Sequence, residues 1–186
     1  MIFNKHLNLE GKHAFLGASN YHWINYDEEK MIVAYNNFLA KQRGTELHEF
    51  AKRCIELSIK LPNNKQTLSM YVNDAIGYRM TPEVILYYSK NAFGTADAIS
   101  FKKNFLRIHD YKSGSVPSSM HQLEIYNALF CLEYKINPEE IKSELRIYQS
   151  NNIIVEEPEP FYIKELMNKI KEADNLINQI EQGDII

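Results

Sequence analysis

The chain has 186 residues, a length that corresponds most simply to one domain with a substantial buried core. Its composition, 45% hydrophobic and 24% charged, is that of an ordinary globular protein. The formal net charge of −3 excludes a general electrostatic attraction to nucleic acid, so such binding would need a local basic patch or a metal ion.

The cysteines and the first residues indicate the cellular compartment. Cys54 and Cys131 fall among apolar residues on expected helices, which favours buried, reduced thiols, and two thiolates cannot hold an iron–sulfur cluster. Residues 1–6 are too polar to open a signal peptide, and no apolar run approaches the roughly 20 residues that span a bilayer. We therefore expect a cytoplasmic protein that makes no membrane contact.

Apolar spacing predicts helices in the first eighty residues. Ser19 can cap a short helix that includes Trp23, and residues 28–41 form the next helix. Gly44-Thr45 interrupts the pattern and is expected to open a further helix over about 45–61, which Pro62 ends. A fourth helix is expected over residues 66–80.

The middle of the chain changes to β-branched and aromatic residues, which are typical of strands. The predicted strands cover residues 83–89, 95–101, 105–112 and 144–149, and residues 153–155 can extend the last of them. Ser118 or Ser119 can cap a helix that runs to about Tyr134, between the third and fourth strands. The order α-β-β-β-α-β predicts an α/β fold, a sheet flanked by helices, with helical additions at both ends.

The C-terminal segment is expected to be one helix over residues 161–182, after a linker marked by Pro158 and Pro160. Its apolar residues recur at heptad spacing and are Ile163, Leu166, Ile170, Ala173, Ile177 and Ile180. Such a stripe can dock on the body of the domain, or it can mediate self-association and produce a homo-oligomer. We accordingly divide the chain into a domain over residues 1–157 and a C-terminal helix within residues 158–186.

Three charged side chains of the predicted hairpin point to a metal site. Asp110 and Lys112 lie two apart on one strand, so both face the same side of the sheet. If strands 95–101 and 105–112 pair around residues 102–104, Asp97 lies near Asp110 or Lys112 across the ladder. Two carboxylates held together repel each other unless a cation or a proton lies between them, and a divalent metal satisfies that requirement.

The acid-x-Lys pattern alone is a weak signal, because this chain also contains Glu10-Gly-Lys12, Glu28-Glu-Lys30 and Glu140-Ile-Lys142. Only Asp110-Tyr111-Lys112 ends a predicted strand, follows a hairpin with another acid and precedes a helix. The alternative is an exposed ion pair on an edge strand.

His48, Gln122 and Tyr126 are further candidates for the same site. A lone helical histidine is more often a core or surface residue than a ligand, but imidazole as a ligand would favour Mn²⁺ over Mg²⁺. Gln122 and Tyr126 lie four apart, on one helical face. They are either a surface pair or a site pair, in which Gln122 holds Lys112 or a phosphate and Tyr126 stacks or hydrogen bonds nearby.

Together these motifs resemble the PD-(D/E)XK nuclease superfamily, in particular its RecB-like and phage exonuclease branch, over residues 16–155. The matching segments are Gly44-Thr45-x-x-His48, Gly94-Thr-Ala-Asp97, Asp110-Tyr-Lys112, Gln122-x-x-x-Tyr126, and Leu16-Gly-Ala-Ser19 followed by Trp23-Ile24. The chain departs from the pattern at Ala96, where many members have proline, and it lacks the cysteines of the iron–sulfur relatives.

The resemblance implies a restriction-endonuclease-like core and a Mg²⁺- or Mn²⁺-dependent DNA nuclease, most specifically an exonuclease of phage recombination or repair in a bacterial or phage-infected cell. It implies that His48, Asp97, Asp110 and the Tyr111 carbonyl bind metal. It further implies that the catalytic residues are Asp97, Asp110, Lys112, Gln122 and Tyr126. Implied partners are single- or double-stranded DNA, with ends favoured, and a strand-annealing protein.

Two other classes of function are open from the residues. A binding or interaction module on the same fold would need no metal, although it would have no reason to keep charges on a core strand. A glycosidase would explain two acids but would leave His48 and Lys112 without roles.

Overall fold

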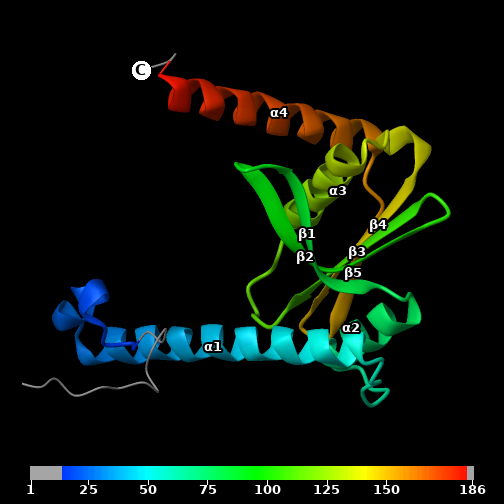
Figure 1. Cartoon of the computed structure of the whole chain (residues 1–186). Helices are drawn as coiled ribbons and strands as arrows, with labels where there is room; N and C mark the ends of the chain where they lie inside the picture. The colour runs from blue at the N-terminus through cyan, green and yellow to red at the C-terminus, as the bar shows by residue number, and fades with distance from the viewer. Residues whose placement is uncertain (1–13, 184–186) are drawn as a thin grey trace, which may run out of the picture. The chain divides into compact units, whose positions relative to one another are not determined.

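The computed structural model describes residues 14–183, which fall into two compact units that meet in sequence between Thr45 and Glu46 (Figure 1). The first unit contains η2 (Ala18–Asn25) and the first part of α1 (Glu28–Glu56). The second unit contains the rest of α1 and all the strands. Residues 1–13 of the predicted domain and residues 184–186 of the predicted C-terminal segment lie outside the described residues.

The first unit is a small aromatic helical assembly. Asp27 begins α1 with its side chain, since its Oδ1 accepts a hydrogen bond of 2.8 Å from the backbone N–H of Lys30. The ring of Phe15 contacts those of Tyr35 and Phe38, with centroids 5.1 and 5.4 Å apart. These contacts join the segment before η2 to the side of α1.

The predicted break at Gly44-Thr45 is wrong, because α1 is one helix from Glu28 to Glu56. A single glycine inside a helix costs only about 1 kcal/mol. The hydroxyl of Thr45 donates to the carbonyl of Lys41 at 3.2 Å, which satisfies it within the helix. The helix also ends earlier than expected, where Ser58 adopts φ +55° and the N–H of Ile59 caps the Cys54 carbonyl.

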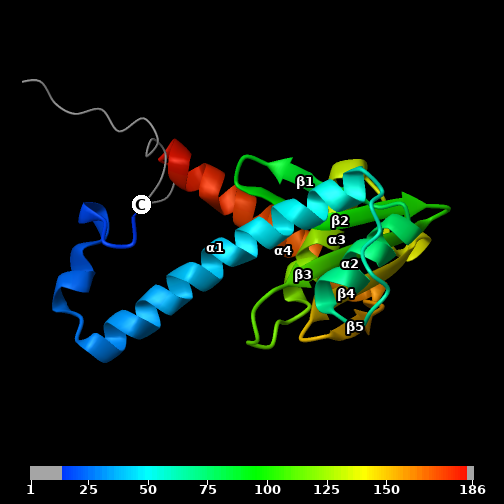
Figure 2. The same cartoon turned by 90° about the horizontal axis from the view of Figure 1, so that it is seen from below.

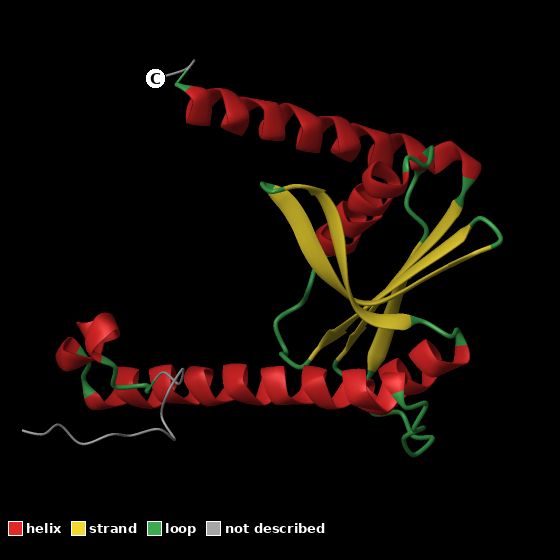
Figure 3. Cartoon of the chain, viewed as in Figure 1, coloured by secondary structure: helices red, strands yellow, loops and turns green. Residues whose placement is uncertain are grey.

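The second unit is built around a five-stranded mixed sheet in sequential order, β1-β2-β3-β4-β5 (Figure 3). The strands are β1 (Thr81–Ser89), β2 (Ala92–Lys102), β3 (Phe105–Lys112), β4 (Lys142–Gln149) and β5 (Asn152–Glu156). All neighbours pair antiparallel except β3 and β4, which run parallel and are joined through α3 (His121–Tyr134) and η3 (Pro138–Glu140). The predicted α/β class, a sheet flanked by helices, is therefore correct.

Helices lie over both faces of this sheet (Figure 2), and each face has its own apolar cluster. On one face, α2 (Thr67–Gly77) and the end of α1 pack against β2, β3 and β4. Its fully buried members include Ala51, Val72, Ala75, Ala98 and Tyr148. On the other face α3 packs through Leu123, Ala128 and Cys131 onto Leu106, Ile108 and Ile147. Cys54 and Cys131 are buried free thiols in different clusters.

Two expectations about the sheet and α3 are wrong. Residues 153–155 belong to a separate strand, because Ser150 and Asn151 both adopt positive φ and turn the chain into a two-residue hairpin. The cap of α3 is Met120, without a side-chain hydrogen bond. The backbone N–H of Ser118 instead donates to Gln149 Oε1.

The C-terminal helix α4 (Pro160–Gln182) packs through its first half against α3. Ile163 is buried, and Leu166 and Ile170 pack against the α3-side cluster. Further along the same stripe, Ile177 and Ile180 are 38% and 53% exposed. In the second half the buried Asp174 accepts hydrogen bonds from the side chains of Ser89 and Asn91, at the turn between β1 and β2. The docking expected of this helix therefore holds along both halves, and self-association through Ile177 and Ile180 stays a prediction.

Candidate metal centre

The site forms where β2 and β3 stop pairing. Their register ends at Ala98↔His109, while β3 continues beside β4 as far as Lys112↔Gln149. The next residues, Asp97 and Asp110, therefore stand at the opening between the strands. The carboxylate of Asp97 occupies part of this opening, since its Oδ2 accepts a hydrogen bond of 2.9 Å from the backbone N–H of Tyr111.

Asp110 begins a connected chain of polar side chains. It is 1% exposed, and its two oxygens lie 3.1 and 3.0 Å from Lys112 Nζ. The same ammonium donates to Gln122 Oε1 at 2.9 Å, and the amide of Gln122 donates to the Tyr126 hydroxyl at 2.9 Å. The sequence-predicted residues of β3 and α3 thus meet, and Gln122 makes the contact with Lys112 that we anticipated.

Gly94 explains how the Tyr126 ring reaches this chain. A Cβ at position 94 would lie 2.8 Å from Tyr126 Cε1, closer than side chains tolerate. Gly94 therefore allows close packing between β2 and α3.

His48 reaches the site from α1. Its Nδ1 lies 3.4 Å from Asp97 Oδ2, and its ring meets that of Tyr111 edge to face with centroids 5.2 Å apart. Burial lowers the pKa of His48, against the opposing field of Asp110, which favours the neutral imidazole that a metal needs. It lies within the continuous α1, and not on the first turns of a helix as expected.

Glu83 completes a group that the sequence analysis missed. His48, Glu83 and Asp97 each offer one ligand atom, and these atoms lie within 4.8 Å of one another. Asp110 is not in this group, since its carboxylate is turned to Lys112. Its Oδ2 is buried and lies 3.0 Å from Lys112 Nζ in an ion pair, without the geometry of a hydrogen bond.

An irregularity in the β1–β2 ladder places Glu83. Pro82 pairs with Ala98 and Val84 with Ala96, so Glu83 lies opposite Asp97. Ala98 packs in the α2-side cluster but Ala96 in the α3-side cluster, which shows that the usual alternation is interrupted between them. Glu83 adopts φ +51°, a conformation rare for a residue with a side chain and often found at functional sites. Pairing the strands predicted over residues 83–89 and 95–101 could have drawn attention to Glu83, but nothing in the sequence indicates its positive φ.

The electrostatics of the site favour a cation. Burial raises the pKa of Asp97 to about 6, and the neighbouring Glu83 adds to the rise. Burial, with the field of Asp97, likewise raises the pKa of Asp110 to about 6. Neighbouring carboxylates ionise more easily when a cation lies between them. Together with an imidazole they form a donor set suited to Mn²⁺ or Mg²⁺. The residues present therefore fit the metal that the resemblance implies.

Comparison of the chain with protein-family models, with curated proteins and with solved structures finds no match. Among the described residues, no helix has both the length and the apolar character that crossing a membrane requires. The chemistry of the site is therefore the guide to function.

Proposed function

We propose that this chain is a metal-dependent DNA nuclease with a restriction-endonuclease-like core, acting as an exonuclease on DNA ends in recombination or repair. The observation that supports it most is the buried Asp110, paired with Lys112, beside the half-buried Asp97 where β2 and β3 separate. Burying such charges costs the fold stability, and a role in catalysis is a common reason for a protein to keep them. We place the activity in the cytoplasm of a bacterial or phage-infected cell, beside a strand-annealing protein.

His48, Glu83 and Asp97 would hold the metal, with Asp110 Oδ2 and the Tyr111 carbonyl as further donors. When bound, Mg²⁺ or Mn²⁺ would lower the pKa of a water ligand and neutralise charge on the scissile phosphate. The imidazole of His48 makes Mn²⁺ the better fit of the two ions.

Lys112 is the chain's own catalytic group in this proposal. Asp110 and Gln122 fix its ammonium from two sides, at 3.0 and 2.9 Å, so little orientational freedom remains to be lost. Its role is to orient the attacking water and to stabilise negative charge that develops on the phosphate oxygens. Tyr126 holds Gln122 in turn and is a positioning residue.

Cleavage of end-labelled linear DNA, single- and double-stranded, tests the proposal. We expect degradation with Mn²⁺ and Mg²⁺ and none in EDTA, and a ladder of products would separate an exonuclease from an endonuclease. Lys112→Ala should lose at least about a hundredfold in rate, as removal of one charge-stabilising group does elsewhere.

Lys142→Ala is the matched control, because Lys142 belongs to another acid-x-Lys sequence but is exposed at the start of β4. It should cleave at the wild-type rate. Absence of metal-dependent cleavage in the wild type would overturn the nuclease and favour a catalytically silent binding module.

A further inference from the structure

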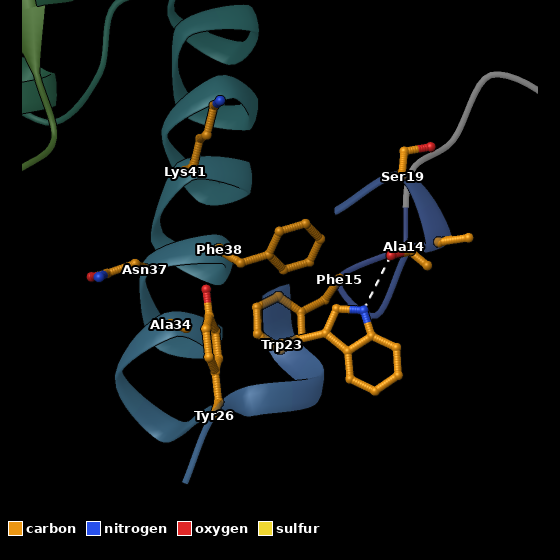
Figure 4. A pocket seen from close by; sticks show the side chains of 11 residues that line it. Ala14, Phe15, Ser19, Trp23, Tyr26, Ala34, Asn37, Phe38 and Lys41 are labelled. Carbon is orange, nitrogen blue, oxygen red and sulfur yellow. Dashed lines mark hydrogen bonds between the residues drawn. The ribbon is translucent and has the colours of Figure 1, made fainter. Parts of the chain in front are cut away.

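A second candidate site lies in the first unit, within residues 14–41. A cavity of about 690 Å³ opens between α1 and the segment that contains η2 (Figure 4). This volume is in the range of small-molecule sites. The sequence between Leu16 and Ile24 that forms one wall has no role in the metal centre.

The lining of this cavity combines aromatic rings with a cation. Figure 4 shows the rings of Phe15, Trp23 and Phe38 converging on the space between the two walls. The indole N–H of Trp23 is already used, since it donates to the Gly17 carbonyl at 3.1 Å, so the indole offers its ring surface to a ligand. All three rings are only half-buried, which leaves area available for stacking.

The polar lining is complementary to an anion. Lys41 lies three residues after Phe38 on the same side of α1, with Asn37 one turn before it. Among the lining residues of the described chain none is acidic, although the whole protein has 24 acidic and 21 basic residues. An aromatic surface, an amide and an ammonium are the groups that meet a base face, a base edge and a phosphate.

We propose that this cavity binds one nucleotide of single-stranded DNA, with the base against Phe15, Trp23 and Phe38 and the phosphate at Lys41. Stacking on a ring recognises every base, so the cavity would hold a strand without sequence preference. This proposal rests on the proposed DNA substrate and adds a second point of attachment for it.

Trp23 allows a direct test, because it is the only tryptophan of the chain. The full-length protein is titrated in EDTA with a 5′-phosphorylated ten-residue thymidine oligonucleotide, and separately with thymidine monophosphate, while tryptophan emission is recorded. We expect saturable quenching by the oligonucleotide, and weaker binding of the mononucleotide at the same site. Binding of the oligonucleotide, seen by anisotropy, without any change in Trp23 emission would overturn the proposal.

Two substitutions on α1 refine this test. Phe38→Leu keeps an apolar residue but removes a ring, and should weaken the quenching titration roughly tenfold. Lys41→Gln should weaken it and lower the salt dependence by about one charge, whereas Arg43→Gln, on another face of α1, should retain the wild-type response. Lys41 is exposed, so its substitution should leave the unit folded. Equal weakening by Lys41→Gln and Arg43→Gln would contradict a contact specific to the cavity.

The titration separates this proposal from the nuclease. Quenching without metal-dependent cleavage would support the cavity and overturn the proposed nuclease. Metal-dependent cleavage without quenching would do the reverse.

Discussion

At the scale of single residues, the site opposes the stability of the fold. Asp97 and Asp110 have folded-state pKa values of about 6, above the ordinary 3.8, because burial disfavours their charged forms. The folded protein therefore binds more protons than the unfolded chain between about pH 4 and 6. Ionisation of these groups lowers the free energy of unfolding of the metal-free protein at neutral and higher pH. This contribution disappears as the pH falls toward 4.

We expect Asp97→Asn to stabilise the metal-free protein while abolishing activity. Asparagine keeps an acceptor for the Tyr111 N–H but removes the buried charge, so the free energy of unfolding at pH 8 should rise by about 1–3 kcal/mol. At pH 5, where the wild-type carboxyl is largely protonated, the gain should shrink. Urea unfolding in EDTA at both pH values measures this, and a variant less stable than the wild type at pH 8 would contradict it.

At the scale of elements, the loop between β3 and α3 carries Lys112 toward Gln122. Residues 113–117 of this loop are exposed, and one buried side chain restrains them. The amide of Gln149 donates to the carbonyls of Gly114 and Val116 at 2.7 Å, and its oxygen accepts from the Ser118 N–H at 3.2 Å. Because Gln149 pairs with Lys112 in the β3–β4 register, it ties the loop to the end of β3 that carries Lys112.

Gln149→Leu should therefore loosen the loop without removing any group that would touch substrate. We expect cleavage to slow several-fold, chiefly in kcat, and the loop to become sensitive to limited proteolysis. Gln149→Glu retains the acceptor for Ser118 but loses both donors, and should be intermediate in proteolysis. Wild-type kcat in a Leu variant with a cut-sensitive loop would show that the loop does not position Lys112.

Elements whose signals are local were predictable from the sequence. The strand over residues 105–112 and its hairpin with β2 were correct, and this hairpin gathers Asp97, Asp110 and Lys112. The continuity of α1 was not predictable from Gly44, because packing and helical hydrogen bonds outweigh a cost of about 1 kcal/mol. Glu83 was missed because its place depends on a left-handed backbone that sequence periodicity does not reveal.

At the scale of the whole molecule, the buried residues are unevenly distributed along the chain. In the described chain all buried residues lie at or after Ala51, in the second unit. Arg107 on β3 is paired with Glu144 on β4 at 3.1 Å, so its charge is compensated within the sheet. If the proposed nuclease is correct, Arg107 is therefore less available to a DNA phosphate than Lys112 or a bound cation would be.

The most direct test of the metal centre is a calorimetric titration of the protein with Mn²⁺. We predict that the wild type binds Mn²⁺, that Glu83→Gln weakens this binding at least about tenfold, and that the exposed Glu140→Gln leaves it unchanged. A wild-type protein that binds no Mn²⁺, or a Glu83→Gln variant that binds it with undiminished affinity, would contradict the metal centre described above.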